Sequence, residues 1–324
     1  MTLTAKKLKN FEKKFGPVPK VVSRLIRPSF VASPGKTLVW GDWSSIEARM
    51  LPWLAGDAGE PNLNIFRAND KDPGAPDIYK IEAAGIYDKE PEEIDKGEER
   101  QVGKVAILAL GFGGGENALD AMATNYGIVI ERKMRHFIVD RWRTNNQWAV
   151  DFWSDLNDAF FRAWDNPGQV FEAGRVAYIF LEDYIFGSMM CFLPDGRPLV
   201  YPDLRREKIK YEDDVTGDLV TEWKVRYQKG YERGSIWHGI LAENITQGAA
   251  ASLLRALLQR LRHEPLLSVV GHTHDEAVVE VVESAAEIAA RALKVQMERN
   301  PGWAPGLPLV AETTTNWYYS KAVG

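Results

Sequence analysis

The sequence is poor in the residues that build disulfides and cysteine-bound metal sites. Its 324 residues include one cysteine, Cys191, so no internal disulfide can form and no cysteine cluster can bind zinc, which fits a reducing compartment. No apolar run is long enough to cross a bilayer, and the first residues, MTLTAKKLKN, lack the apolar stretch of a signal peptide. These absences predict a cytoplasmic location and no membrane partner.

Net charge is also small, at −5, and this mild acidity argues against nucleic acid as the main partner. The charge is nevertheless uneven along the chain. Residues 1–36 hold nine Lys and Arg against the single acid Glu12, whereas residues 72–100 hold ten acids and four bases. Only the local field acts on a polyanion within a Debye length. The basic start is therefore either a solvated arm or a contact for nucleic acid.

The composition, 45% hydrophobic and 26% charged, is typical of a globular protein, and the sequence contains neither an internal repeat nor a low-complexity linker. Hydrophobic periodicity and turn residues predict an α+β protein. The predicted helices cover residues 4–15, a segment from Ser44, most of 77–165, 240–262 and 284–299. The predicted strands cover 37–40, short segments around turns at 194–196 and 213–218, and a hairpin of 266–270 and 277–282; residues 56–76 are predicted to be a loop. Strands at both ends with helices between them indicate a sheet platform that carries a helical subdomain.

Three segments carry residues suited to chemistry, and the first is LVWGDWSSIEAR at 38–49. It places Asp42 at the end of an apolar strand, just before a helix. A carboxylate at the end of a rigid strand is well placed to bind a divalent cation. However, Ser44 and Glu47 have the spacing of a capping box, and on this segment alone helix capping is the favoured interpretation.

The second segment, GHTHDEAVV at 271–279, places Asp275 and Glu276 at the tip of the predicted hairpin. Two aspartates that bridge two Mg²⁺ ions roughly 3.5–4 Å apart would activate an attacking oxygen and stabilise a leaving one. Two alternatives stay open for this segment. It is a solvated polar turn, or His272 and His274, on one face of a strand, bind a transition metal.

The third segment is RQVGKVAILALGFGGG at 100–115. Four of its residues recur at every fourth position and so form a stripe along one helix face: Arg100, Lys104, Leu108 and Phe112. The cations would meet a triphosphate and the apolar end a base. The alternative is an amphipathic helix with a solvated basic face and a glycine stop. The glycines match neither GxxxxGK[ST] nor a strand-linked GxGxxG, so the segment is not a phosphate loop.

The order of the three segments resembles motifs A, B and C of the family A DNA polymerases, the group of bacterial DNA polymerase I, and most closely their bacteriophage-type branch. Further similar text lies at 24–40 (RLIRPSFVASPGKTLVW), 77–79 (DIY), 193–201 (LPDGRPLVY), 241–250 (LAENITQGAA) and 306–312 (GLPLVAE). The resemblance covers nearly the whole chain from about residue 18. It implies template-directed DNA synthesis in replication, in which a primer 3′-hydroxyl attacks a dNTP and primer–template DNA is the partner.

The resemblance also implies a fold, a right-hand polymerase palm made of an antiparallel sheet with helices, and an inserted helical fingers subdomain. Residues 1–19 are then a basic N-terminal arm, and 20–56 are the first part of the palm, with motif A. Residues 57–189 are the fingers, with the motif B helix at about 98–112, and 190–324 are the second part of the palm, with motif C.

By position, the resemblance makes Asp42 and Asp275 the metal-binding, catalytic aspartates. They would hold two Mg²⁺ ions, for which Mn²⁺ can substitute, with the backbone carbonyl of Trp43 as a further ligand. Glu276 would be an accessory carboxylate.

The resemblance likewise implies a dNTP site. Arg100 and Lys104 would clamp the triphosphate, and Lys104 would give a proton to the leaving pyrophosphate. Glu47 stands in the place of the steric gate that disfavours a 2′-hydroxyl, and Phe112 in that of the aromatic near the templating base. Leu108 replaces an aromatic residue usual in the family, so we predict altered sugar discrimination.

Four residues are assigned to DNA by the same resemblance. Gln247 would contact the minor groove and His274 the primer terminus, and Arg27 and Arg49 would also bind DNA.

The family's thumb and proofreading exonuclease precede motif A, and the residues before Asp42 are too few to build a thumb. This favours the C-terminal catalytic part of a split replicative polymerase, whose separate N-terminal polypeptide carries thumb and exonuclease. An excised fragment or a reduced enzyme is the alternative, and a phage-encoded chain would act in the cytoplasm of an infected bacterial cell. Two further classes stay open: a non-catalytic remnant that binds DNA or a polymerase, and another two-metal carboxylate nucleotidyltransferase or nuclease.

Overall fold

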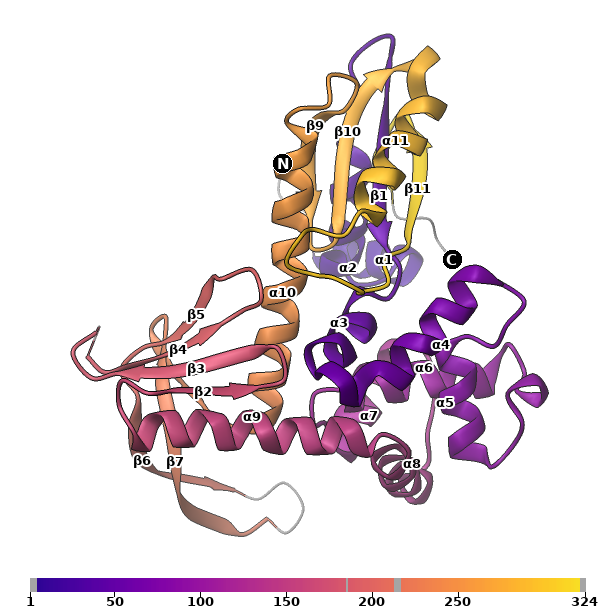
Figure 1. The fold of residues 1–324 in the computed structure, drawn as a ribbon. Helices are drawn as coiled ribbons and strands as arrows, with labels where there is room; N and C mark the ends of the chain where they lie inside the picture. The colour runs from indigo at the N-terminus through magenta and orange to yellow at the C-terminus, as the bar shows by residue number, and fades with distance from the viewer. Residues whose placement is uncertain (1–4, 185, 213–216, 321–324) are drawn as a thin grey trace. The chain divides into compact units, whose positions relative to one another are not determined.

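The computed structural model describes residues 5–184, 186–212 and 217–320, and the chain divides into two compact units (Figure 1). Unit 1 combines residues 1–44, 253–299 and 309–324, and unit 2 combines 45–252 and 300–308. Helices and antiparallel strands occur in both units, so the predicted α+β class is confirmed. The finer division into palm and fingers stays a prediction. No helix among the described residues is both long and apolar enough to cross a membrane.

Unit 1 is built on a four-stranded antiparallel sheet of order β11-β1-β10-β9. Its strands are β1 (Lys36–Trp43), β9 (Ser268–Thr273), β10 (Glu276–Val282) and β11 (Ala311–Asn316). Helix α11 (Ala286–Glu298) packs on one face, where the Trp43 indole donates a hydrogen bond to the Met297 carbonyl at 2.9 Å. On the opposite face Trp40 meets Tyr319 edge to face, with ring centroids 5.4 Å apart. The predicted strand at 37–40 and the predicted hairpin are both confirmed.

The chain enters unit 1 through two helices, α1 (Ala5–Phe15) and α2 (Val18–Ile26), and a 3₁₀ turn, η1 (Arg27–Ser29). The predicted basic helix is confirmed in α1, which ends before Gly16, whose φ of 89° suits glycine. After η1 the backbone is hydrogen-bonded to residues 317–319. The Ala32 N–H donates to the Trp317 carbonyl, and the Tyr319 N–H donates to the Phe30 carbonyl.

Unit 2 contains the predicted helical block, which is confirmed. Its helices are α3 (Ile46–Leu54), α4 (Glu60–Lys71), α5 (Ile78–Tyr87), α6 (Glu98–Leu110), α7 (Glu116–Asn125), α8 (Arg132–Asn145) and α9 (Gln147–Asp165). The motif B helix, α6, stops two residues short of its predicted end, so Phe112 follows the helix in a turn.

Two local predictions in this unit are wrong. The segment 56–76 is not a loop, because most of it forms α4, and Pro61 occupies the first turn, where a missing N–H costs nothing. Leu63 and Phe66, three residues apart, are buried on one side of α4. The capping box at Ser44 is also absent, because Ser45 is the N-cap of α3 and makes no side-chain capping bond.

The rest of unit 2 holds two antiparallel sheets and the start of α10 (His238–Leu261), the predicted long helix. One sheet consists of β2 (Val170–Ala173), β3 (Val176–Leu181), β4 (Ser188–Phe192) and β5 (Pro198–Tyr201). Helix α9 packs on it through Phe160, whose ring meets Tyr178 and Tyr201 edge to face. Cys191 lies in β4 as a buried free thiol. The other sheet consists of β6 (Arg205–Glu212), β7 (Leu219–Lys229) and β8 (Glu232–Ser235).

Candidate active site

The two predicted metal-binding aspartates lie on neighbouring strands of the unit 1 sheet. Asp42 lies within β1, which continues beyond the predicted end at residue 40, and Asp275 lies in the tight turn between β9 and β10. The register pairs Asp42 with Glu276, so Asp275 directly precedes the residue opposite Asp42. Both aspartates are half-buried, at the same end of the β1–β10 pair. The fold therefore brings together two carboxylates that are 233 positions apart in the sequence.

The residues on either side of Asp42 fix this strand against its neighbours. A Cβ on Gly41 would lie 2.6 Å from the Met297 sulfur and 3.3 Å from the Glu312 carbonyl oxygen, so a larger residue would displace the Met297 side chain and crowd β11. Trp43 is anchored by its bond to Met297. Asp42 is thus held on a rigid strand, as its sequence position predicted.

The donor chemistry of this pair fits Mg²⁺. Carboxylate oxygens are the hard ligands that Mg²⁺ prefers, and it commonly binds through one or two carboxylates while water and substrate phosphates fill the remaining positions. Among the described residues no group of three or more His, Cys, Asp or Glu side chains is arranged to hold a metal ion. A site at Asp42 and Asp275 therefore needs ligands beyond protein side chains.

Glu276, the predicted accessory carboxylate, has partners inside the protein. The residue is 2% exposed, and its carboxylate forms an ion pair with Arg27 at 3.0 Å and accepts a hydrogen bond from the Tyr319 hydroxyl. Burial and the bond to Glu276 raise the pKa of Tyr319 to about 12. The Arg27 guanidinium also lies 5.0 Å from the centre of the Tyr319 ring. Glu276 thus ties η1 to the sheet, and its catalytic role stays a prediction.

The predicted triphosphate clamp lies on α6 in unit 2, where Arg100 and Lys104 are one turn apart. Asp77, the N-cap of α5, accepts the backbone N–H of Lys80 with one oxygen and pairs with Arg100 through the other, at 2.7–2.8 Å. The Tyr79 ring lies 5.2 Å from the Arg100 guanidinium and 5.8 Å from the Lys104 ammonium. Both cations are therefore arranged by the first turn of α5.

A glycine makes the close approach of α5 and α6 possible. A Cβ on Gly103 would lie 2.2 Å from the Tyr79 carbonyl oxygen, so any larger residue would push the helices apart. Lys104 follows Gly103 on α6, and its ammonium also lies 5.0 Å from the centre of the ring of Tyr126, which follows α7. Burial and the charge of Arg100 lower the pKa of Lys104, which makes it a better proton donor than an exposed lysine.

The predicted sugar and base contacts line one pocket of unit 2. Glu47, Leu108 and Phe112 all lie in its wall. Glu47, which the sequence assigned partly to a capping box, instead accepts a hydrogen bond from the side chain of Gln247 on α10. The structure therefore brings the predicted steric gate and the predicted minor-groove residue into direct contact.

The same pocket contains polar residues that the sequence analysis missed. Glu82 on α5 is 6% exposed and accepts a hydrogen bond from the Asn146 side chain at 2.9 Å. Its other oxygen, Oε1, has no hydrogen-bond partner among the described residues. Burial raises the pKa of Glu82 to about 7 although Asn146 opposes the shift. An acid within the apolar stretch IEAAGI was the available signal.

The remaining predicted DNA-binding residues differ in exposure. His274 is exposed at the β9–β10 turn, with a φ of 48°, and Gln247 is exposed on α10. Arg49 is 3% exposed, forms a two-pronged ion pair with Asp70 and lies 4.5 Å from the Phe66 ring centre. Contact between Arg49 and DNA would require this arrangement to open, so that role stays a prediction.

Known proteins similar to this chain are DNA polymerases. No protein-family model matches it. The DNA polymerase of Bacillus phage SP02 is 35% identical over 310 residues, which cover 95% of this chain and 45% of the relative. DNA polymerase I of Chloroflexus aurantiacus is 30% identical over 124 residues, which cover 38% of this chain and 12% of the relative. The chain spans less than half the length of the curated relatives that it matches.

A solved structure agrees at the level of the fold. The POL domain of Pol1 from M. smegmatis, in complex with DNA primer-template and dNTP, matches with a TM-score of 0.56 at 17% identity. The match covers 93% of this chain and 43% of that one. Sequence and fold together relate this chain to the DNA polymerases. It is related over nearly its whole length to the phage SP02 enzyme, in agreement with the resemblance of its three motifs to family A.

Proposed function

We propose that the chain catalyses template-directed DNA synthesis, in which a primer 3′-hydroxyl attacks the α-phosphate of a dNTP and pyrophosphate leaves. The observation that carries the proposal is the pair Asp42 and Asp275 on neighbouring strands, in the segments that resemble motifs A and C. Two carboxylates from adjacent strands suit a two-metal reaction. The metals, when bound, lower the pKa of the attacking hydroxyl and neutralise charge on the phosphates.

The chain's own residues would orient the nucleotide. Arg100, held by Asp77, is positioned before substrate arrives, so less side-chain entropy is lost when it binds a phosphate. Lys104 would protonate the leaving pyrophosphate, a role that its lowered pKa supports. Both residues supply positive charge where negative charge develops in the transition state.

Selection for a deoxyribose would rest on Glu47. Its hydrogen bond to Gln247 holds the carboxylate at the wall of the pocket that also contains Leu108 and Phe112. A side chain fixed in this way can exclude a 2′-hydroxyl by contact. Leu108 cannot stack as an aromatic residue would, so the discrimination between sugars should differ from that of an enzyme with Phe or Tyr there.

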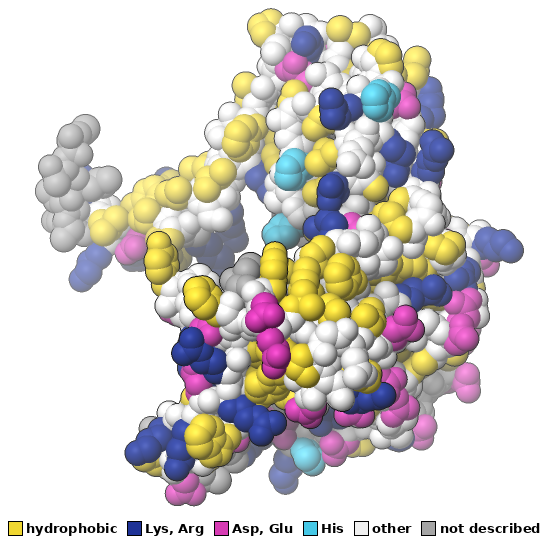
Figure 2. All heavy atoms as spheres, turned by 60° about the vertical axis from the view of Figure 1, so that its left-hand side comes forward, with side chains coloured by type: hydrophobic (Ala, Val, Ile, Leu, Met, Phe, Trp, Pro, Cys, Tyr) yellow, Lys and Arg dark blue, Asp and Glu magenta, His cyan; other side chains and the backbone are white. Residues whose placement is uncertain are grey.

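We also propose a protein partner, a separate polypeptide that carries the thumb and exonuclease. Helix α2 supports it, because none of its residues is buried and Val22, Leu25 and Ile26 are 51–61% exposed. Figure 2 shows a row of hydrophobic side chains along the helical arm that begins at the N-terminus, with Lys and Arg on its other side. A contiguous exposed apolar row of this kind is typical of a protein interface.

The partner is tested with the part of the SP02 polymerase that lies outside the matched region, expressed separately. It should bind this chain and lengthen its primer-extension products, and Leu25→Asp should weaken both effects, whereas Lys13→Ala on α1 should not. Equal binding by Leu25→Asp would contradict an interface on α2. In a phage-infected cell this assembly would act in the cytoplasm.

The function is tested by primer extension with Mg²⁺, in which dNTPs are compared with rNTPs. The proposal expects template-directed extension with dNTPs, weak use of rNTPs, and a loss of discrimination in Glu47→Ala. Extension with rNTPs alone would indicate an RNA polymerase, degradation without extension would indicate a nuclease, and DNA binding without either would indicate a non-catalytic remnant.

A further inference from the structure

The sheet β6-β7-β8 has two faces of different chemistry. The register pairs Arg206 with Val225, Lys208 with Trp223 and Lys210 with Thr221. Side chains alternate between the faces of a strand, so these residues share one face, which we call the lysine–tryptophan face. The opposite face, called the ion-pair face, carries Arg205, Glu207, Lys224, Arg226 and Arg233.

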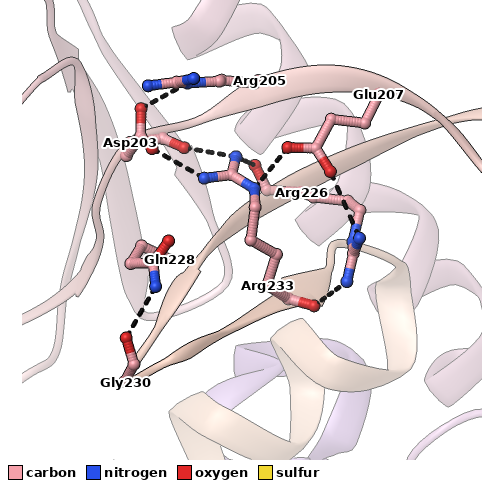
Figure 3. A network of polar contacts seen from close by, with 7 residues as sticks. All are labelled: Asp203, Arg205, Glu207, Arg226, Gln228, Gly230 and Arg233. Carbon is pink, nitrogen blue, oxygen red and sulfur yellow. Dashed lines mark hydrogen bonds and ion pairs between the residues drawn. The ribbon is translucent and has the colours of Figure 1, made fainter.

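On the ion-pair face the cations are neutralised by carboxylates (Figure 3). Arg205 and Arg233 both pair with Asp203, at 2.6 and 2.7 Å, and Arg226 pairs with Glu207 at 3.2 Å. Farther along β7, Lys224 pairs with Glu222 at 2.6 Å. These pairs tie the three strands together and leave little net charge on this face.

Among the described residues, the ring contacts of the lysine–tryptophan face lie at its inner end. There the Tyr227 ring meets Tyr201 of β5 edge to face at 5.1 Å, and the Arg206 guanidinium lies 5.3 Å from the centre of the Trp164 ring on α9. These two contacts hold the base of the hairpin on this face, as the ion pairs hold it on the other. Its outer half carries Lys208, Lys210 and Trp223.

These three outer residues are exposed and available to a ligand. Trp223 is 68% exposed, directly opposite Lys208, and both lysines are exposed. Within the part of the chain that the structure describes, neither lysine forms an ion pair. Lys208 and Lys210 are two residues apart on a strand, which separates their Cα atoms by about 6.8 Å. The face therefore offers a row of positive charge beside a large flat ring.

This combination fits a single nucleic acid strand. Exposed aromatic rings on sheet surfaces stack bases, and neighbouring cations follow the phosphates. An acidic peptide would also meet the lysines, but it has no flat base to stack on Trp223. The ring therefore favours the nucleic acid.

We infer that the lysine–tryptophan face binds single-stranded DNA, with a base stacked on Trp223 and phosphates at Lys208 and Lys210. The inference rests on the proposed function, which supplies such a strand as the unpaired template.

The test measures binding of a fluorescein-labelled oligo-dT of about 16 nucleotides by anisotropy over a range of salt concentrations. Trp223→Ala should raise Kd by about 5- to 150-fold, the loss expected for one stacked base. Lys208→Ala with Lys210→Ala should reduce the slope of log K against log salt by about 1.4, because two phosphate contacts are lost. A purely structural role would not change this slope.

Matched controls lie elsewhere in unit 2. Phe186, 86% exposed, controls for the loss of an exposed ring, and Lys71 with Lys133, both exposed, control for the loss of two charges. Their alanine variants should bind oligo-dT within about twofold of the parent. Parental affinity in Trp223→Ala, or equal losses in the controls, would overturn the inference. The inference would also be overturned if substitutions on the lysine–tryptophan face lowered the affinity for oligo-glutamate and left the affinity for oligo-dT unchanged.

Failure of the inference can be separated from failure of the proposed function. Asp42→Asn should abolish primer extension and still bind oligo-dT as the parent does, because Asp42 lies outside the hairpin. A chain that extends primers, and whose Trp223→Ala variant binds oligo-dT normally, refutes the inference alone. A chain that binds through Trp223 but never extends a primer refutes the proposed function alone.

Discussion

Replacing Glu82 with glutamine should stabilise the chain by an amount that grows with pH. Glu82 is buried, one of its oxygens accepts from Asn146, and the other has no hydrogen-bond partner among the described residues. Burial disfavours the charged form and raises the pKa of this carboxyl from 4.5 to about 7. The folded chain therefore keeps a proton that the unfolded chain has already released.

The size of the effect follows from this difference in pKa. Between about pH 4.5 and 7 the unfolded state binds fewer protons than the folded state, so the free energy of unfolding falls as pH rises, by up to about 1.4 kcal/mol per pH unit. The contribution of Glu82 is fully present below pH 4.5 and is lost as pH passes through 7. Between pH 5 and 8 the loss is about 2–3 kcal/mol. Glutamine does not titrate and should not show it.

Urea denaturation of the parent and of Glu82→Gln at pH 5, 6, 7 and 8 measures this directly. The difference in free energy of unfolding between variant and parent should increase by about 2–3 kcal/mol across the range. Glu172→Gln, at an exposed position on β2, serves as the control and should show a much smaller change. A variant-minus-parent difference that stays constant with pH would refute the reasoning.

Three further predictions concern the proposed dNTP site and the sheet of unit 1. Asp77→Asn keeps a good helix cap but removes the charge partner of Arg100, so the KM for dNTP should rise by up to about fivefold with little change in stability. An unchanged KM would show that Asp77 does not position Arg100. Leu108→Phe should change the ratio of dNTP to dideoxynucleotide incorporation by about 2- to 12-fold in competition assays, since it adds a ring that can stack; a ratio equal to the parent's would refute this. Arg27→Ala should lower the free energy of unfolding by about 1–3 kcal/mol, because the buried Glu276 carboxylate loses its cation. In a double-mutant cycle followed by denaturation, adding Glu276→Gln should recover part of this loss. Losses that simply add would argue against the ion pair.

The sequence predicted the elements that carry the carboxylates, because their signals are local. An apolar run before Asp42 identified β1, and two β-rich runs around Asp275 identified the β9–β10 hairpin. That these strands are neighbours is a tertiary fact, which the resemblance to a family supplied and local pattern could not.

The wrong predictions were based on residues that are typical of two different local structures. Proline and glycine at 56–76 were interpreted as a loop, but Pro61 begins α4, where proline is favoured. Glu47 has the spacing of a capping acid, yet its partner is Gln247, 200 residues away. The spacing of residues within one segment cannot show that a side chain from another helix will form the hydrogen bond instead of the helix cap.

Other parts of the site carried no pattern that predicts them. Asp77 begins the predicted helical block, but its bond to Arg100 depends on α5 and α6 packing closely at Gly103. Glu82 is a single acid in an apolar stretch, and its burial against Asn146 depends on the packing of its helix. Both contacts join residues far apart in the sequence, so they follow from the fold.

The most direct test of the account is Mg²⁺-dependent primer extension by the parent, Asp42→Asn and Asp275→Asn, with the chain alone and with the proposed N-terminal polypeptide added. Asp158→Asn, at an exposed position on α9, is the matched control. The account predicts that each of the two strand aspartates, when replaced, lowers the extension rate by at least about a hundredfold, whereas the control extends primers as the parent does. Extension that survives both Asp42→Asn and Asp275→Asn would contradict the proposed two-metal mechanism.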